Sequence, residues 1–219
     1  MNRAICLASI AMVGAAIGGC ATVRHQLDRE GALVESPARG WRAVATERDR
    51  RRLHDWRSAF LAGLTAARRA GAGTRIEAEG SLLAPDAAVP GPALPNGAYL
   101  CRTIKLGASA PGLPAYRVAP SVACRVDRHG GMQSLAALGG MQRMVGMIFP
   151  GDAVRSVFLG TLMLGDEGRA MQYGGDPDRD VAGHVERVGP RRWRLVVPRP
   201  AFESMADVVE LIPAPSASR

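Results

Sequence analysis

Residues 97–107 read GAYLCRTIKLG, and this stretch decides the fold class of the chain. From Tyr99 to Leu106 the run is strand-like, and Gly107 ends it in a turn. A second run with the same layout, VACRVDRHG, follows at residues 122–130, where an arginine again follows a cysteine and a glycine again ends the run. The two runs predict a β-sheet in this part of the chain.

Short apolar or alternating runs recur after Pro95, and clusters of Gly, Pro and Asp that are typical of hairpin turns separate most of them. Predicted strands cover residues 99–106, 116–126, 132–138, 141–149, 154–164, 170–173, 181–188, 193–197 and 208–212. The last run is also compatible with a closing helix, since residues 205–211 carry apolar side chains at helical spacing. About eight or nine antiparallel strands in succession fit a small barrel or a sandwich. We expect an up-and-down β-barrel over residues 96–213, filled by side chains or holding one small ligand.

Residues 41–95, before the sheet, carry a helical pattern. Thr46 is a good N-cap, and Asp49 three residues later resembles the partner in a capping box. Apolar residues then recur at three- and four-residue spacing, namely Leu53, Trp56, Phe60 and Leu64. This spacing predicts a helix over residues 47–70, and a second, shorter helix is expected over 74–83. The predicted fold class is therefore α+β, with a helix or helix pair packed on a small antiparallel β-barrel.

The first residues have the layout of a bacterial export signal. Arg3 supplies a positive charge, and residues 4–17 form an apolar stretch that is shorter than the roughly 20 residues needed to span a bilayer. Small residues before Cys20 resemble a lipobox, so we predict a lipoprotein signal peptide at residues 1–19 and lipidation of Cys20. An ordinary signal peptide that happens to contain Cys20 is the alternative.

Residues 20–40 are polar and read as a flexible tether, and residues 214–219 are expected to be a disordered tail. No Asp follows Cys20. By resemblance to lipoprotein sorting, this predicts an outer-membrane lipoprotein that faces the periplasm. More than one acyl chain, such as palmitate, is needed for stable attachment to the membrane.

The cysteine count agrees with export. Cys6 leaves with the signal peptide and Cys20 carries the lipid, so Cys101 and Cys124 remain as the natural pair in an oxidising compartment. We predict a disulfide between them, with two buried free thiols as the alternative. The four histidines are scattered and no Cys-x-x-Cys occurs, so a zinc site is disfavoured.

The charge balance limits the partners. The chain carries 28 Lys and Arg residues against 20 Asp and Glu residues, and Lys105 is its only lysine. In a cytosolic protein this charge would suggest nucleic acid, but export argues against nucleic acid as a partner. We expect attachment to a membrane through the lipid anchor, with an envelope protein or a small anionic or apolar ligand as a further partner.

Three residues are candidates for ligand binding. Arg102 and Arg143 could present planar donors to an anion inside the barrel, and Trp193 lies between two arginines like a stacking platform. The structural alternatives are a buried ion pair between Arg102 and a carboxylate, with Asp166, Glu167 and Glu186 as possible partners, and a Trp193 that simply points inward.

The chemistry of metals and catalysis has weaker support. Asp176, Asp178 and Asp180 have a spacing that can turn carboxylates toward a cation, but Val181 and Arg187 stand where an EF-hand needs Gly and Glu. We therefore predict no metal and no cofactor. None of the familiar motifs of hydrolases or phosphate-binding loops is present. The remaining enzymatic hypothesis is an envelope hydrolase that uses carboxylates near residues 166–180.

The pattern as a whole resembles a bacterial family, domain of unknown function 4893, found in secreted proteins and lipoproteins of alphaproteobacteria. The resemblance covers roughly residues 41–213 and rests on GAYLCRTIKLG, GGMQRMVGMIFP, VFLGTLMLGDE, YGGDPDRDVAGHVERVG and RRWRLVVPRPAFESMADVVEL. It implies no activity and no catalytic residue. The favoured hypothesis is a non-enzymatic module that binds a ligand or protein, or supports the envelope.

Lipidation can be tested directly. We expect cells that express the chain to incorporate radiolabelled palmitate into it and to retain it in the membrane fraction, because acyl chains partition into the bilayer. Absence of palmitate, together with fractionation among soluble cytosolic proteins, would contradict both the lipid anchor and the predicted location.

Overall fold

The computed structural model describes residues 40–91, 93–129 and 131–215. The predicted signal peptide, most of the tether, the lipidation site Cys20 and the last four residues of the predicted tail lie outside the described residues. The described residues all belong to one compact unit, Ala38–Arg219. None of the helices in the described residues is long and apolar enough to cross a membrane.

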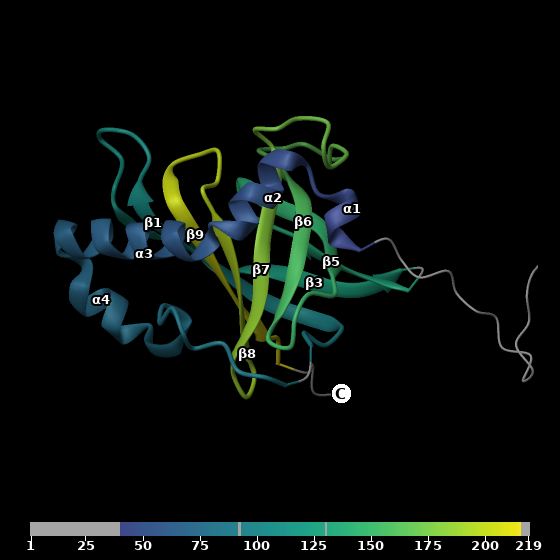
Figure 1. The fold of residues 1–219 in the computed structure, drawn as a ribbon, viewed down its shortest axis with the longest axis horizontal. Helices are drawn as coiled ribbons and strands as arrows, with labels where there is room; N and C mark the ends of the chain where they lie inside the picture. Colours follow the sequence, from purple (N-terminus) through teal and green to yellow (C-terminus); the bar gives the residue numbers. More distant parts are fainter. Residues whose placement is uncertain (1–39, 92, 130, 216–219) are drawn as a thin grey trace, which may run out of the picture. The chain divides into compact units, whose positions relative to one another are not determined.

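In the described part of the chain, nine antiparallel strands follow the helical segments. Figure 1 shows how they are arranged. They are β1 (Gly97–Ala108), β2 (Tyr116–Val118), β3 (Val122–His129), β4 (Met132–Ala137), β5 (Gln142–Phe149), β6 (Arg155–Leu164), β7 (Asp180–Gly189), β8 (Arg192–Pro198) and β9 (Ser204–Pro213). Neighbours pair in the order β2-β1-β3-β4-β5-β6-β7-β8-β9, and β1 also pairs with β9. Eight strands therefore form a closed barrel with β2 outside it, which confirms the predicted fold class.

The strand predictions are wrong in two places. Residues 170–173 belong to the long connection between β6 and β7 and not to a strand, and the predicted strand 116–126 is two strands separated at Ala119-Pro120. Proline cannot donate to a strand ladder, which explains the break. The run at 205–211 is the strand β9 and not a helix.

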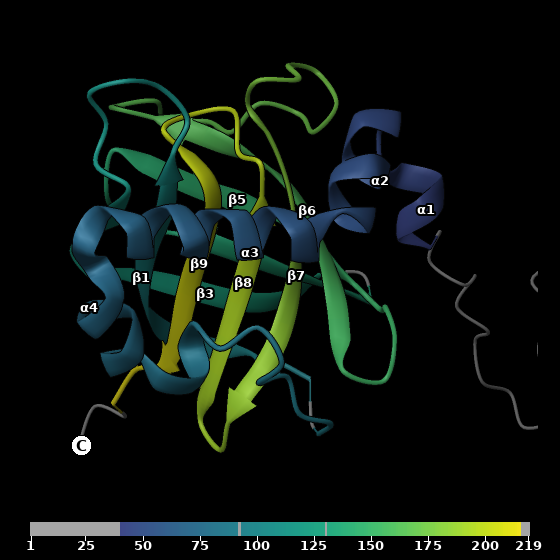
Figure 2. The ribbon, with the colours of Figure 1, turned by 60° about the vertical axis from the view of Figure 1, so that its left-hand side comes forward.

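Short helical segments precede the barrel, namely α1 (Trp41–Val44), α2 (Glu47–His54), α3 (Trp56–Ala67), the π-helix η1 (Arg68–Ala72), α4 (Gly73–Ala78) and the 3₁₀ helix η2 (Gly80–Leu82). The helix predicted over 47–70 is interrupted at Asp55, while Thr46 caps α2 by accepting a hydrogen bond from Asp49 N. Helix α3 lies across the outer face of the barrel (Figure 2). Its buried Phe60 and Leu64 belong to one apolar cluster with Ile104 and Val208.

A buried arginine ties the end of the helical segment to the barrel. Arg194 on β8 is fully buried, and its guanidinium pairs with Glu186 on β7 at 2.6 Å. Arg194 Nη1 also donates to the carbonyls of Leu82 and Ala84, both at 2.8 Å, which fixes the end of the helical segment against the sheet.

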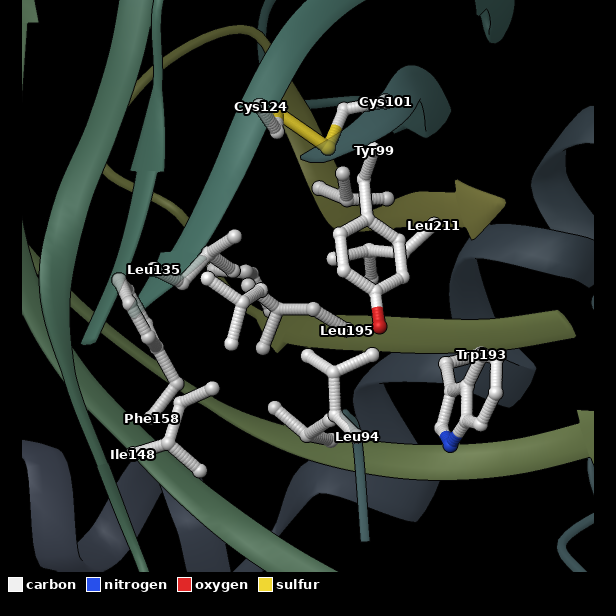
Figure 3. Close-up of a cluster of buried hydrophobic side chains, with 14 of the residues drawn as sticks. Leu94, Tyr99, Cys101, Cys124, Leu135, Ile148, Phe158, Trp193, Leu195 and Leu211 are labelled. Atoms are coloured by element: carbon white, nitrogen blue, oxygen red, sulfur yellow. A yellow bond between two sulfur atoms is a disulfide. The ribbon is translucent and has the colours of Figure 1, made fainter. Parts of the chain in front are cut away.

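One end of the barrel is closed by the connection that follows the helices. Leu94 is 3% exposed and packs into the interior cluster with Tyr99 and Trp193, whose rings meet edge to face with centroids 6.4 Å apart (Figure 3). The Tyr99 hydroxyl donates to Pro95 O at 2.6 Å and Gln133 Nε2 donates to Leu94 O at 2.6 Å. This end is therefore plugged.

The middle of the barrel is filled. Phe158 on β6 is fully buried, and its ring lies so close to the Cα atoms of Gly146 and Gly160 that a Cβ at either position would be 2.7 Å from it. Cys101 and Cys124 are joined in a disulfide between β1 and β3, as predicted, with Cα atoms 5.9 Å apart.

The contribution of the buried pair Arg194–Glu186 to the stability of the fold can be tested. Arg194→Met should lower the free energy of unfolding by up to about 3–5 kcal/mol, because the buried Glu186 carboxylate loses one of its two partners and keeps only Arg155. The double variant with Glu186→Leu should be less destabilised, because no buried carboxylate remains there and Arg155 is partly exposed, with Asp152 3.7 Å away. Urea unfolding followed by circular dichroism measures both.

Arg57→Met is the matched control, because Arg57 pairs with Asp86 at 2.6 Å but on the exposed surface. Solvent screens such a pair, so the unfolding midpoint should stay unchanged. Equal losses in the three variants would contradict a special role for the buried pair.

Candidate functional site

The end of the barrel opposite Leu94 holds a cavity of about 410 Å³. The loops that join β1 to β2, β6 to β7 and β8 to β9 lie together at this end, which is the upper end in Figure 2. We call this cavity the mouth. Because the middle of the barrel is filled by Phe158 and its neighbours, the mouth is a pocket with a floor and not a channel.

Inward-facing side chains of several strands make the wall and floor of the mouth. They are mainly apolar, namely Cys101, Val122, Met144, Leu162, Val181 and Val197, with Pro120, Met141 and Pro200 nearer the rim. Since successive side chains of a strand point to opposite faces, every second residue contributes. Apolar walls of this kind suit an apolar ligand.

One side of the mouth is charged. Lys105 on β1 is 7% exposed, and its Nζ donates to Asp207 Oδ2 on β9 at 3.0 Å and pairs with Glu203 Oε2 at 3.3 Å. Glu203 Oε2 also accepts from Arg117 Nη2 and, at 3.4 Å, from Gln142 Nε2. Lys105, Arg117, Glu203 and Asp207 form what we call the mouth cluster, with two cations and two carboxylates.

The two carboxylates of the mouth cluster differ in environment. Burial raises the pKa of Asp207 above its ordinary value, and the hydrogen bonds from Lys105 and Ser204 offset this only in part. Burial also opposes ionisation of Glu203, but Lys105 and Arg117 together hold its pKa below the ordinary value. Glu203 is thus the more stable anion of the two.

The loop that carries Glu203 is strained. Glu203 has φ 70° and Arg199, at the other end of the same loop between β8 and β9, has φ 46°. Non-glycine residues in this left-handed region cost of order 1–3 kcal/mol each, and such strain gathers at ligand-binding sites. Ser109 N donates to Glu203 O at 3.2 Å and helps to hold the loop over the mouth.

A second hollow, of about 480 Å³, lies outside the barrel between the N-terminal helices and strands β6 and β7. Two of its arginines already have carboxylate partners, since Arg50 pairs with Glu47 at 2.9 Å and Arg155 with Glu186 at 2.6 Å. His184 lies there with its Nε2 3.1 Å from Leu53 O, and burial lowers the pKa of His184. The His184 contact fastens α2 to the sheet and gives this hollow a structural role, so we take the mouth as the candidate functional site.

The comparisons with known proteins give one match. The family model described as domain of unknown function (DUF4893) matches residues 41–211. The chain belongs to this family. No curated protein and no solved structure matches it significantly. The DUF4893 region contains the whole mouth cluster and nearly all of the barrel, so membership fixes the extent of the domain and leaves the activity to be argued from the site.

In this DUF4893 domain, Arg102 does not enter the barrel. It lies on the outer face of β1, where its guanidinium donates to Glu79 Oε2 at 2.6 Å and to Glu210 Oε2 at 2.8 Å. The hypothesis that it enters the barrel is therefore wrong. The structural alternative of an ion pair with a carboxylate is found, but on the outside of the barrel and not with Asp166, Glu167 or Glu186. The strand alternation that turns Cys101 inward turns Arg102 toward the helices.

Arg143 and Trp193 also lie away from the mouth. Arg143 Nη2 donates to Gly165 O at 3.1 Å and to Glu167 O at 2.6 Å, so it supports the loop between β6 and β7. Trp193 is 4% exposed and faces the interior at the plugged end, in agreement with the inward alternative. The structure therefore does not bring the three predicted ligand-binding residues together.

The three aspartates of the weak metal candidate have separate partners. Asp176 Oδ1 accepts from Asp178 N, Asp178 Oδ1 pairs with Arg48 at 3.3 Å, and Asp180 Oδ1 accepts from Gly174 N at 2.8 Å. Among the described residues, no group of three or more His, Cys, Asp or Glu side chains is placed to hold a metal ion.

Sequence reasoning missed the mouth cluster. Asp207 and Glu203 lie about a hundred residues from Lys105 along the chain, and the register of β1 against β9, which sets Lys105 opposite Asp207, cannot be read from a single sequence. One signal was present, because a single lysine in an arginine-rich chain is unusual.

The pKa of Asp207 predicts a pH dependence for this DUF4893 domain. An unfolded Asp titrates near about 3.9, and the folded carboxyl binds its proton up to a higher pH. Between the pKa of the unfolded Asp and the higher pKa of the folded one, the folded state binds more protons than the unfolded state. The stability of the native protein therefore falls as the pH rises through this range. Asp207→Asn removes this titration, so the stability of the variant relative to that of the native chain should increase as the pH rises above about 4.

Chemical unfolding at a series of pH values measures the effect. Asp178→Asn, at an exposed carboxylate, is the control and should track the native chain throughout. A stability difference between Asp207→Asn and the native chain that stays constant or moves the opposite way would show that Asp207 titrates normally.

Proposed function

We propose that this chain is a non-enzymatic binding module whose barrel mouth holds one small, mainly apolar ligand with a polar head. The observation that carries the proposal is the mouth itself, a pocket of about 410 Å³ with apolar walls and one charged side. This volume lies in the range of about 300–1,000 Å³ that is usual for small-molecule sites, and few convergent polar groups on apolar walls are typical of them.

The charge of the mouth cluster favours a neutral head. Lys105 and Arg117 balance Glu203 and Asp207, so an anionic or a cationic head would add an uncompensated charge to a partly buried site. The sequence alone allowed a small anionic or apolar ligand, and the cluster argues for the apolar one.

The hydrogen bonds of the cluster favour an acceptor. Both carboxylate oxygens of Asp207 already accept hydrogen bonds, one from Lys105 and one from Ser204. Arg117 has five N–H groups, and within the described residues it donates one hydrogen bond, to Glu203. Lys105 has a third N–H beyond its two carboxylate partners. A carbonyl or hydroxyl oxygen on the ligand would accept these donors, so the proposed ligand is an apolar molecule with a neutral oxygen head.

The setting we propose for this binding is the bacterial envelope, with the chain attached to the outer membrane through Cys20 and facing the periplasm. The Cys101–Cys124 disulfide is consistent with an oxidising compartment. The ligand would then be an envelope molecule, and a protein partner at the same mouth is the other form that binding could take.

The alternative of an envelope hydrolase gains no support from the carboxylates near residues 166–180. Glu167 accepts two hydrogen bonds from Arg179, which hold its pKa below the ordinary value, whereas a general acid needs a raised pKa. Asp180, whose pKa burial raises, is bonded to Gly174 N on the outer side of the barrel. Neither residue lines the mouth.

Ligand competition tests the proposal. The neutral fluorophore N-phenyl-1-naphthylamine should brighten on binding, and octan-1-ol should displace it at a concentration at least about tenfold lower than octanoate or octylamine, because a charged head must lose its hydration without gaining a partner. The three competitors share one chain length and differ only in head charge.

Met144→Trp, which fills the mouth, should weaken displacement by octan-1-ol about tenfold or more, in keeping with the loss of an apolar pocket. Met171→Trp is the control, because Met171 is an exposed methionine on the loop between β6 and β7. Equal affinity of both variants, or no fluorescence change with the native chain, would refute binding in the mouth.

A further inference from the structure

The mouth cluster contains the only lysine of the chain. Every other cationic residue among the 28 Lys and Arg residues is an arginine, including those that make the buried pairs on the outside of the barrel. Arginine therefore serves for ion pairing elsewhere in this protein, and ion pairing alone does not explain why residue 105 is a lysine. What lysine offers and arginine does not is a compact amine that can lose its proton and become a nucleophile.

A group that can accept the proton of Lys105 lies beside it. Asp207 Oδ2 lies 3.0 Å from Nζ, and the raised pKa of this buried carboxyl makes it a better proton acceptor than an ordinary aspartate. Apolar residues line the rest of the mouth, so the apolar chain of a ligand can lie beside the amine. The amine, its proton acceptor and space for a ligand thus occur at one place.

We propose that Lys105 forms an imine with an aldehyde or ketone group of the ligand. The inference rests on the proposed binding function and names its ligand class, an apolar carbonyl compound. One Lys105 proton passes to Asp207, and Nζ adds to the carbonyl carbon to form a C–N bond. The carbonyl oxygen then receives that proton back from Asp207 and a second proton from Nζ, and it leaves as water when the C–O bond breaks. The product is a protonated C=N group, and no oxidant or reductant takes part.

Charge balance explains why this product suits the site. The iminium carries the same single positive charge on Nζ as the ammonium that it replaces, so Asp207 at 3.0 Å and Glu203 at 3.3 Å keep their counter-ion. Arg117, which contacts the same Glu203 oxygen as Lys105, can donate to the carbonyl oxygen before it leaves. The ligand chain would then lie against Met144, Leu162 and Val181.

Reductive trapping tests the inference on the full chain. Octanal with sodium cyanoborohydride should give one octyl adduct in the peptide that contains Lys105, and the N-terminal amine is the only other primary amine that can compete. We expect trapping at Lys105 to be at least about tenfold faster in the folded chain than in urea, because the mouth holds amine and carbonyl together.

Two variants make the result specific. Lys105→Arg should give no adduct at residue 105. Arg69→Lys adds an exposed lysine far from the mouth, on the π-helix η1, and measures the reactivity of a solvated amine within the same molecule. Lys105 should be trapped at least about tenfold faster than this second lysine.

The outcomes separate the two proposals. If octan-1-ol and octanal both displace the fluorophore but Lys105 is trapped no faster than the lysine of Arg69→Lys, the mouth binds ligands and the imine is refuted. If neither compound binds and trapping stays at the level of the exposed lysine, the proposed binding function falls as well.

Discussion

The closure of the barrel by β1 and β9 is the constraint on which the rest of the structure depends. The two strands pair from Tyr99 opposite Pro213 to Ala108 opposite Ser204, and the register leaves no freedom in which residues face inward. Tyr99, Cys101, Thr103 and Lys105 line the interior of the barrel in that order. The outer face of β1 consequently packs against the helical segments through Arg102, Ile104 and Leu106. A single strand thus contributes both to the mouth and to the contact with α3.

Along that inner row the environment changes from one barrel end to the other. Tyr99 belongs to the plugged end with Leu94 and Trp193, Cys101 forms the disulfide at the floor of the mouth, and Lys105 lies at the charged side. Under the proposed function, a ligand with one polar end would therefore bind with its apolar end toward the disulfide and its head toward Lys105. Because the other end of the barrel is plugged, the ligand would enter through the mouth alone.

Much of this fold could be predicted from the sequence, because hydrophobic period and turn residues are local properties. The barrel, the disulfide and the inward Trp193 follow from alternation and cysteine count. The break at Asp55 and the loss of a strand at 170–173 do not, since tertiary contacts decide them: Tyr173 donates to Asp49 Oδ2 at 2.7 Å and holds that loop against α2. The candidate site was missed for the same reason, because strand register brings Lys105 and Asp207 together across about a hundred residues.

The energetic cost of the mouth supports its role as a site. A buried Lys105–Asp207 pair loses hydration that apolar side chains in its place would not lose, and well-packed apolar replacements of such pairs are often neutral or stabilising. The left-handed backbone of Glu203 adds strain of order 1–3 kcal/mol at the same place. The plugged end is closed by the apolar side chain of Leu94 and not by a buried ion pair. Since stability alone would favour the same solution at both ends, the difference between them supports the ligand binding that we propose for the mouth.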